Sequence, residues 1–494
     1  MSYWILPFLI TIGYASFVVY VGFRAKGKLD MKKSENWGGA GKSMNGMVMY
    51  FTMGAAAVSA YTFMGAPGWS FSKGIPIMYV MIYCIYQAYN NYFLGTRAWR
   101  LSQDHGISTM AEAFGERYQS KSVRGVASFV TSIALIFYAV LQISGCGYIL
   151  NIMSGGNIPV WLGELVICAA IAFYVYFSGL RAVGWTNVAQ GVLMLTIGWV
   201  VAFIISYKVT GSIWFTEIFR ALSVSNPAHM TLPGNTGEWS MTFWTTSILI
   251  STFSWWPTMW IASVGSTSPN ALRKSSIMLP TFFLSMIPML VVGFICITQM
   301  NGYEGRIDSV ALDLSLNTVP WIVAGLLGAG TLAAAQSSAA PLFQGVSMTW
   351  TADILAQIFK WDKDKIGVVQ RNLMLPIIFL LVLPMSVLNP TSLPNLLLIG
   401  YGFLSQAYPL IIGMFFWPRS TKHGAFAGMF LGVAVLVYCS FINVHPLGIH
   451  AGVWGWMVNI PTHIIVSLLT QPERKEVIEK FYPKHLIEKL YRAA

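Results

Sequence analysis

The chain has 494 residues, of which 55% are hydrophobic and 10% are charged. Soluble domains carry about 25% charged residues, and the mean hydropathy here is +0.61. These values exclude an ordinary soluble protein and favour a bilayer as the solvent. The net charge of +12 then indicates a cytoplasmic rim attracted to anionic membrane lipid, and not a surface that binds nucleic acid.

Apolar stretches of about 20 residues, the length of a membrane-crossing helix, recur along the whole chain. In chain order they predict thirteen spans, at 3–23, 46–66, 74–95, 125–150, 158–178, 183–206, 239–262, 276–298, 319–350, 372–389, 396–417, 424–442 and 450–470. We expect the first to be retained and not cleaved as a signal peptide, because its basic cluster follows the apolar stretch. The sequence therefore predicts an all-α integral membrane protein.

The basic residues test this count independently, because loops rich in Lys and Arg stay in the cytoplasm. With the N-terminus outside, the inward connections and the C-terminal tail hold 26 of the 30 basic residues. The outward connections hold the other four, Lys73, Lys208, Arg220 and Arg306. This bias would disappear if a single span were added or dropped in mid-chain. We therefore expect a protein of a bacterial plasma (cytoplasmic) membrane with its N-terminus outside and its C-terminus in the cytoplasm.

Several common kinds of site are not predicted. The five cysteines lie inside predicted spans without CxxC spacing, which favours free buried thiols. The segment GGAGKS at 38–43 has Asn36 where a phosphate loop would need glycine. The spans contain no Ser/His/Asp, Cys/His or metal-spaced cluster, so no catalytic residue is assigned and no enzyme is expected.

Acidic residues lie almost entirely in the predicted loops. Glu164 and Asp353 come near the ends of spans, and we interpret both as interfacial. A carboxylate inside a membrane is by default a functional hypothesis, but the centre of this membrane domain offers no obvious one. Any cation bound there must be held by neutral oxygens.

Two adjacent serines, Ser337 and Ser338, lie in the apolar run AAAQSSAAPL at 333–342. On a helix they share a face with Ala334, so one carbonyl and two hydroxyls point the same way. The alternative is close helix packing, or a hydrogen bond to the preceding turn. A sodium ion needs further oxygens, and a regular helix has no free carbonyls to supply them.

Interrupted helices would supply those carbonyls. The segment MGAAAVSAYTFMGAPG at 53–68 is punctuated by glycine and proline, and Pro257 interrupts STFSWWPTMW at 251–260. Such breaks are tolerated in a membrane where the freed backbone lines a cavity or binds a ligand. The two breaks fall in corresponding places if spans two to six and seven to eleven form an inverted repeat.

Five stretches together resemble the solute:sodium symporter family, and the resemblance covers nearly the whole chain. They are GGAGKSMNG, SAYTFMGAPG, GLRAVGWTNVAQG at 179–191, GLLGAGTLAAAQSS at 325–338 and FFWPRSTKHGAFAG at 415–428. The resemblance implies a LeuT-type inverted five-helix repeat and sodium-coupled solute uptake. We expect one transporter domain at 1–494, comprising a first helix and basic loop (1–45), a first repeat (46–206), a second repeat (239–417), and two extra helices with a cytoplasmic tail (418–494).

The resemblance also implies a sodium site of backbone carbonyls and two hydroxyls. Its positions look like Ala55, Val58, Ala334, Ser337 and Ser338.

Three further positions depart from relatives. Proline transporters of the family carry an aspartate at what looks like Ala57, which makes proline a less suited solute. An auxiliary sodium site of some relatives uses an aspartate and a hydroxyl at what look like Asn187 and Ala339. We therefore expect one sodium ion and no other metal.

The solute site of this fold lies beside the two helix breaks. The residues expected there or at its gate are Tyr61, Thr62, Phe253, Trp256, Pro257, Gln142 and Gln406. An aromatic pocket with few polar groups favours a monocarboxylate or another small organic acid, because the N-termini of half-helices favour its carboxylate. The alternatives are a sodium-coupled amino-acid, vitamin or sugar symporter, a sensory transporter-like module, or a channel.

Overall fold

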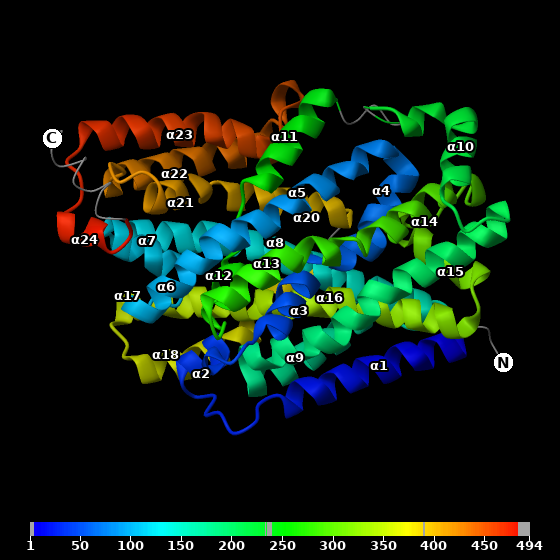
Figure 1. The fold of residues 1–494 in the computed structure, drawn as a ribbon, viewed down its shortest axis with the longest axis horizontal. Coiled ribbons are helices and arrows are strands. Elements are labelled where there is room, and N and C mark those ends of the chain that lie inside the picture. The colour runs from blue at the N-terminus through cyan, green and yellow to red at the C-terminus, as the bar shows by residue number, and fades with distance from the viewer. Residues whose placement is uncertain (1–3, 233, 235–239, 389–390, 483–494) are drawn as a thin grey trace.

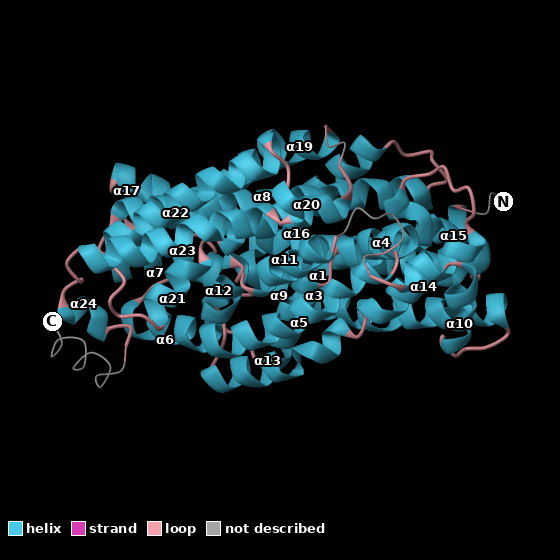
Figure 2. Ribbon diagram, turned by 90° about the horizontal axis from the view of Figure 1, so that it is seen from above, coloured by secondary structure: helices cyan, strands magenta, loops and turns pink. Residues whose placement is uncertain are grey.

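A computed structural model describes residues 4–232, 234, 240–388 and 391–482. Long helices run side by side along one direction, and α1 begins at the end opposite to α24 (Figure 1). Within these ranges the chain is helical and forms no strand (Figure 2), only an isolated bridge between Met44 and Ser266. The expected all-α class is confirmed. The predicted end residues 3, 239 and 389, and the tail beyond 482, lie outside the described residues.

Among the described residues, ten α-helices precede residue 233 and fourteen follow residue 239. The first group is α1 (Ile5–Arg24), α2 (Ser34–Gly39), α3 (Gly46–Ala57), α4 (Ala66–Lys73), α5 (Tyr79–Asn90), α6 (Thr96–His105), α7 (Met110–Tyr118), α8 (Lys121–Met153), α9 (Val160–Thr210) and α10 (Thr216–Ser225). The second group is α11 (Met241–Thr252), α12 (Pro257–Val264), α13 (Pro269–Phe283), α14 (Met286–Gln299), α15 (Val310–Thr318), α16 (Trp321–Thr349), α17 (Ala356–Phe359), α18 (Lys363–Pro376), α19 (Leu383–Val387), α20 (Leu393–Ser405), α21 (Tyr408–Phe415), α22 (Lys422–Val437), α23 (Ala451–Leu469) and α24 (Lys475–Glu479).

The number of membrane crossings stays a prediction. In the described part of the chain, nine helices are long and apolar enough to cross a membrane, or ten if the bent pair Gly46–Ala57 and Tyr61–Lys73 is one span. The predicted span 74–95 forms as a 3-10 turn (Ile75–Met78), α5 and a π-helical turn (Asn91–Gly95). Residues 240–262 contain α11 and α12 with a break between them. A third difference is α9, which is counted as one membrane-crossing helix although it covers two predicted spans.

Gly179 divides α9 into the two predicted spans. A helix of 51 residues would be roughly 76 Å long, more than twice the thickness of a hydrocarbon core. Gly179 has φ 54° and ψ −146° inside it, a conformation that only glycine adopts readily. A Cβ there would lie 2.3 Å from the carbonyl oxygen of Trp37. The connection between α1 and α3, which contains Trp37, therefore packs directly on the bend.

Two helices are broken where the sequence predicts it. The first break separates α3 from a π-helical turn, Tyr61–Gly65, which continues into α4, and the two parts bend by 51°. The second separates α11 from α12, which begins with Pro257. Proline lacks an N–H and suits the first position of a helix, so it can start α12 but cannot continue α11.

The core of the bundle is built around α16. This helix is buried over almost its whole length and packs against α1, α3, α8 and α9. Small residues permit the close approach, since a Cβ on Gly330 would lie 2.7 Å from the Ile197 side chain. The five cysteines are free and buried, which confirms that prediction. The two predicted serines therefore lie at the centre of the protein, away from lipid.

Candidate sodium and solute site

At the first break, side chains replace the missing helical hydrogen bonds. The backbone N–H of Ser59 donates to Thr62 Oγ1 (3.2 Å), and that of Tyr61 donates to Ser59 Oγ (3.2 Å). Between them, the N–H of Ala60 donates to Gln142 Oε1 on α8 (3.0 Å). Buried N–H groups must be paired, and these three are. The carbonyls to which these N–H groups would donate in a regular helix, those four residues earlier, are released.

Those released carbonyls meet the two serines of α16. Ser337 Oγ donates to the carbonyl of Ala55 (2.8 Å) and lies 2.9 Å from that of Ala334. Ser338 Oγ donates to the carbonyl of Ala56 (3.0 Å). Both serines are almost fully buried. The structure thus brings four of the five expected sodium-site residues, Ala55, Ala334, Ser337 and Ser338, into one group of neutral oxygens.

Val58, the fifth expected residue, is the first residue beyond α3. Its backbone is extended, with φ −89° and ψ 115°, so its carbonyl leaves the direction of the α3 hydrogen bonds. The described residues contain no group of three or more His, Cys, Asp or Glu that would hold a metal. Carbonyl and hydroxyl oxygens suit a hard cation such as sodium and do not suit a transition metal.

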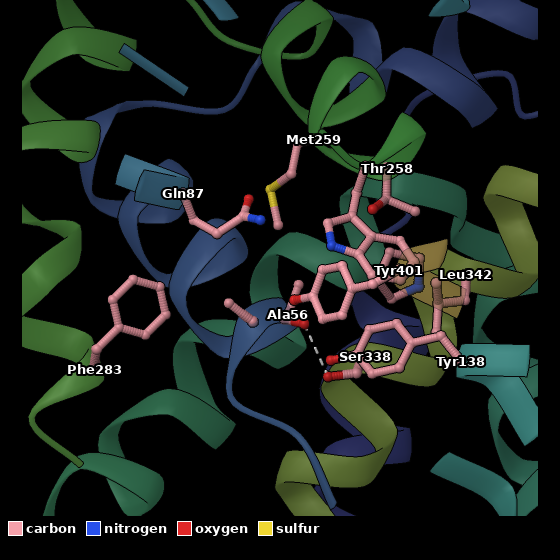
Figure 3. Close-up of a pocket in the computed structure, with 12 residues that line it drawn as sticks. Ala56, Gln87, Tyr138, Thr258, Met259, Phe283, Ser338, Leu342 and Tyr401 are labelled. Atoms are coloured by element: carbon pink, nitrogen blue, oxygen red, sulfur yellow. Dashed lines mark hydrogen bonds between the residues drawn. The ribbon is translucent and has the colours of Figure 1, made fainter. Parts of the chain in front are cut away.

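A small cavity borders this group of oxygens. It measures ≈ 30 Å³, about the room of one water molecule. Its walls are Ala56, Ala57, Gln87, Tyr138, Trp256, Thr258, Met259, Phe283, Ser338, Pro341, Leu342 and Tyr401. Figure 3 shows the Ser338–Ala56 hydrogen bond beside the rings of Tyr138 and Tyr401.

Three aromatic rings close the cavity. The Trp256 ring centroid lies 4.8 Å from that of Tyr138 and 5.4 Å from that of Tyr401. These side chains come from the second break, from α8 and from α20. A solute of several heavy atoms requires them to separate.

Of the residues predicted for the solute site, some line the cavity and others hold the backbone of the first break. Trp256 lines the cavity, and Pro257 follows it as the first residue of α12. Gln142 and Thr62 do not line it, because they hold the backbone of the first break. Tyr61 is also absent from the wall, and its hydroxyl donates to that of Tyr79 (3.2 Å).

Two predicted residues lie away from the cavity. Phe253 is 38% exposed and packs against Tyr408 and Trp456. Gln406 is turned toward α23, where its amide donates to the carbonyl of Gly452 (3.0 Å). Phe253 directly follows α11, and Gln406 directly follows α20. The sequence does not show which way each side chain points.

Sequence reasoning missed most of the cavity wall, including Tyr138, Tyr401, Gln87 and Phe283. A signal existed for Tyr138, because it lies four residues before Gln142 and shares its helix face. The others come from helices far apart in the sequence, and no local pattern joins them.

The two positions expected from the resemblance for an auxiliary sodium site carry neutral side chains. Asn187 is buried on α9, and its amide donates to the carbonyl of Thr52 (3.3 Å). Ala339 is buried on α16 and offers no hydroxyl. The Asn187 amide is therefore already hydrogen-bonded to the backbone of α3.

The two acids interpreted as interfacial are both buried and serve other contacts. Glu164 accepts a hydrogen bond from Ser386 Oγ (2.9 Å). Asp353 accepts from Arg124 (2.8 Å) and from Thr109. Neither lines the cavity, and their hydrogen bonds join neighbouring helices: Glu164 connects α9 with α19, and Asp353 connects its helix with the starts of α7 and α8.

Comparison with known proteins identifies the family of the chain. The model of the sodium:solute symporter family matches residues 39–432, and the chain belongs to this family. It is 25% identical to the symporter YhjB of Bacillus subtilis, over 96% of this chain and 99% of that one. It is 24% identical to the high-affinity proline transporter PutP of the same organism, over 89% and 94%.

A solved structure shares the fold. A Na⁺-coupled sialic acid symporter, captured in a substrate-bound outward-open state, superposes with a TM-score of 0.76 at 17% identity, covering 95% of this chain and 98% of that one. The broken helices and the central α16 are therefore those of a membrane transporter with the LeuT-type fold. Sodium is the ion of this family.

Proposed function

We propose that this protein imports a small organic acid, such as a monocarboxylate, together with one sodium ion by alternating access. One observation carries the proposal. The hydrogen bond between Ser338 Oγ and the Ala56 carbonyl belongs both to the group of neutral oxygens and to the wall of the cavity. An ion that reorients these oxygens reshapes the cavity, which is the physical requirement for coupled binding.

The sodium ion is assigned to the carbonyls of Ala55, Val58 and Ala334 and to the hydroxyls of Ser337 and Ser338. A dehydrated cation loses favourable hydration, so several oxygens must replace it. Each serine hydroxyl now donates to a carbonyl. With an ion present, the hydroxyl oxygens turn toward the ion and the carbonyls become ligands.

The organic acid is supported by the composition of the cavity wall. Aromatic and apolar groups dominate, and Ala57 stands there without a carboxylate. An amino acid carries an ammonium group that would be buried without a counter-charge, at a cost of several kcal/mol. An acid instead finds the polar groups of Gln87 and Thr258 and the N-terminus of α12.

Two relatives leave an amino acid as the second candidate. PutP is named for proline, and the sialic acid symporter for a sugar acid. Both molecules carry a carboxylate, which is the group shared with our proposal. A vitamin, a neutral sugar or a sensory role has less support from the wall of the cavity.

Uptake in proteoliposomes tests the proposal. A radiolabelled panel of pyruvate, lactate, acetate, proline, pantothenate and glucose is offered with an inward sodium gradient and with potassium in its place. We expect uptake of one or more of the acids with sodium only. Sodium-independent uptake, or uptake of proline alone, contradicts the proposal.

A further inference from the structure

The end of α1 and the bend of α9 form one surface with α18. The helices α1 and α9 pack side by side, and α18 contacts both α9 and α2. Figure 1 shows α2 and α18 near the end of α1 that is farther from the N-terminus. With the N-terminus outside, as the basic residues predict, this end faces the cytoplasm. It is therefore where the helices meet the lipid headgroups of the inner leaflet.

Three phenylalanine rings on this surface are exposed. Phe23 of α1 is 44% exposed, and Phe173 and Phe177 of α9 are 45% and 37% exposed. The centre of the Phe23 ring lies 5.4 Å from that of Phe173 and 5.8 Å from that of Phe177. The three rings, which we call the phenylalanine patch, thus form one apolar surface across two helices. In a bilayer such a surface faces the acyl chains of lipid.

Arg371 of α18 stands at the edge of the phenylalanine patch. Its guanidinium lies 4.6 Å from the centre of the Tyr176 ring, and that ring lies 5.3 Å from the Phe177 ring. The Tyr176 hydroxyl donates to Asn372 Oδ1 (3.0 Å), which fixes the ring. Among the described residues Arg371 forms no ion pair, and its Nε has no hydrogen-bond partner. The tyrosine therefore positions a guanidinium whose charge is not neutralised by a neighbouring acid.

Arg24 and Arg181 bring two more guanidinium groups to the same end of the bundle. Arg24 follows Phe23 at the end of α1 and is exposed. Arg181 comes two residues after the bend of α9, and its Nη1 would lie 3.3 Å from a Cβ on Gly27. Neither forms an ion pair in the described part of the chain. Three helices therefore each contribute one such arginine beside the phenylalanine patch.

The connection after α1 adds further positive charge. Lys26 and Lys28 are exposed. The next acid along the chain, Asp30, accepts the backbone N–H of Lys32 (3.0 Å). The surface is thus positive beside an apolar patch, and this combination matches an amphiphile with an anionic headgroup.

We propose that the phenylalanine patch and the guanidinium groups of Arg24, Arg181 and Arg371 bind one anionic phospholipid of the inner leaflet. The acyl chains of the lipid lie along the rings, and its phosphate accepts hydrogen bonds from the guanidinium groups. The planar fork of arginine matches the geometry of phosphate oxygens, often through two parallel bonds. Neither the ion nor the transported solute takes part in this binding.

This site differs from the general attraction of a basic rim for an anionic membrane. Rim attraction depends on the total charge near the surface, and salt screens it beyond a Debye length of about 8 Å. The proposed site depends instead on which arginines are present and on the rings beside them. The decisive control is therefore to remove equal charge elsewhere on the rim.

Native mass spectrometry of the full-length protein in detergent counts bound lipids. The protein is titrated with dioleoyl phosphatidylglycerol, with dioleoyl phosphatidylcholine and with glycerol phosphate. We expect one phosphatidylglycerol to bind about tenfold more tightly than phosphatidylcholine, whose choline group cancels the charge of the phosphate. Equal affinity for the two lipids would overturn the proposal. Displacement of the lipid by equimolar glycerol phosphate would also overturn it, because the site would then bind a free phosphate.

Two matched pairs of variants locate the bound lipid. Arg181→Gln with Arg371→Gln removes two guanidinium groups of the site, and the Kd for phosphatidylglycerol should rise about tenfold. Arg273→Gln with Lys274→Gln removes two charges from α13, whose start is also expected on the cytoplasmic side, and should change the Kd by less than about twofold. Equal effects of the two pairs would show rim attraction only and would overturn the site.

Two milder variants separate the site from a loss of folding. Arg371→Lys keeps the charge but loses the planar fork, so the Kd should rise about threefold. Phe173→Ala with Phe177→Ala removes most of the phenylalanine patch, and the Kd should again rise about threefold. Size-exclusion chromatography checks that each protein is folded. Wild-type affinity in both folded variants would overturn the assignment. Transport enters none of these measurements, so they stand or fall separately from the proposed function.

Discussion

The two helix breaks have the same architecture but different chemistry. At the first, between α3 and α4, the Ser337 hydroxyl lies 2.8 Å from the Ala55 carbonyl and the Ser338 hydroxyl lies 3.0 Å from the Ala56 carbonyl. At the second, between α11 and α12, indole and amide groups dominate. The Asn90 amide donates to the carbonyls of Thr252 and Ser254 (3.3 Å each).

From this difference we propose separate tasks for the two breaks. Small residues at the first break leave room for backbone oxygens to converge, which suits a dehydrated cation. Large rings at the second, such as Trp255, whose indole donates to Asn91 Oδ1 (2.9 Å), exclude water and suit an organic solute. The cavity between them takes one wall from each break. Variants at the two breaks should therefore have different effects on ion and solute.

The largest expected effect comes from removing the serine hydroxyls. In the double variant Ser337→Ala and Ser338→Ala, two ion ligands are lost, each bond to a charged group contributing about 1.5–3 kcal/mol. The sodium concentration for half-maximal uptake should rise by about 100-fold or more. Uptake as a function of sodium concentration measures it. Ser276→Ala is the control, because Ser276 is buried and bonds only within its own helix; unchanged sodium dependence in the double variant contradicts the ion site.

The sequence predicted the helices and both breaks because these depend on local features. Pro257 and the small residues at 53–68 act on the helix that contains them. The meeting of Ser337 with Ala55 joins residues 282 positions apart, and it was expected only through the resemblance to a family. The direction in which a side chain points was harder to predict from the sequence. Phe253 and Trp256 lie three residues apart, and only Trp256 lines the cavity.

Variants of Trp256 and Phe253 form a matched pair for testing the solute site. Trp256→Ala removes a ring from the cavity wall, and buried aromatic anchors of this kind contribute about 2 kcal/mol to binding. The KM for the solute should rise about 30-fold, with sodium dependence changed less. Phe253→Ala should change the KM by less than about threefold. Initial uptake rates against solute concentration decide this, and an equal effect of both variants would contradict the cavity as the solute site.

A variant of Gln142 tests the contribution of the backbone at the first break. In Gln142→Ala the N–H of Ala60 loses its acceptor, and an unpaired buried group costs about 1–3 kcal/mol. The melting temperature should fall by a few degrees, and the sodium requirement should rise modestly, about threefold. Thermal unfolding in detergent together with uptake measures both. Gln406→Ala is the control. It removes the contact with α23, so it should lower the stability without changing the sodium requirement.

The smallest expected effect concerns the number of sodium ions. By the family resemblance, we expect Asn187 and Ala339 to stand where some relatives carry an aspartate and a hydroxyl of an auxiliary sodium site. The Asn187 amide donates to the Thr52 carbonyl. Asn187→Asp restores the charge without the hydroxyl, and it removes this donor and buries a carboxylate beside a carbonyl. We expect one sodium ion per solute in the wild type and the same ratio, or weaker transport, in the variant.

The reversal potential of solute-driven current in liposomes at fixed gradients gives this ratio. The charge of the solute must be included, because one sodium ion with a monocarboxylate moves no net charge and two sodium ions move one. An electroneutral cycle would therefore show no current, and sodium flux measured beside solute flux then supplies the ratio. Two sodium ions per solute in the wild type would show a second ligand set. Glu164, a buried acid outside the cavity, is the first residue to substitute in that case.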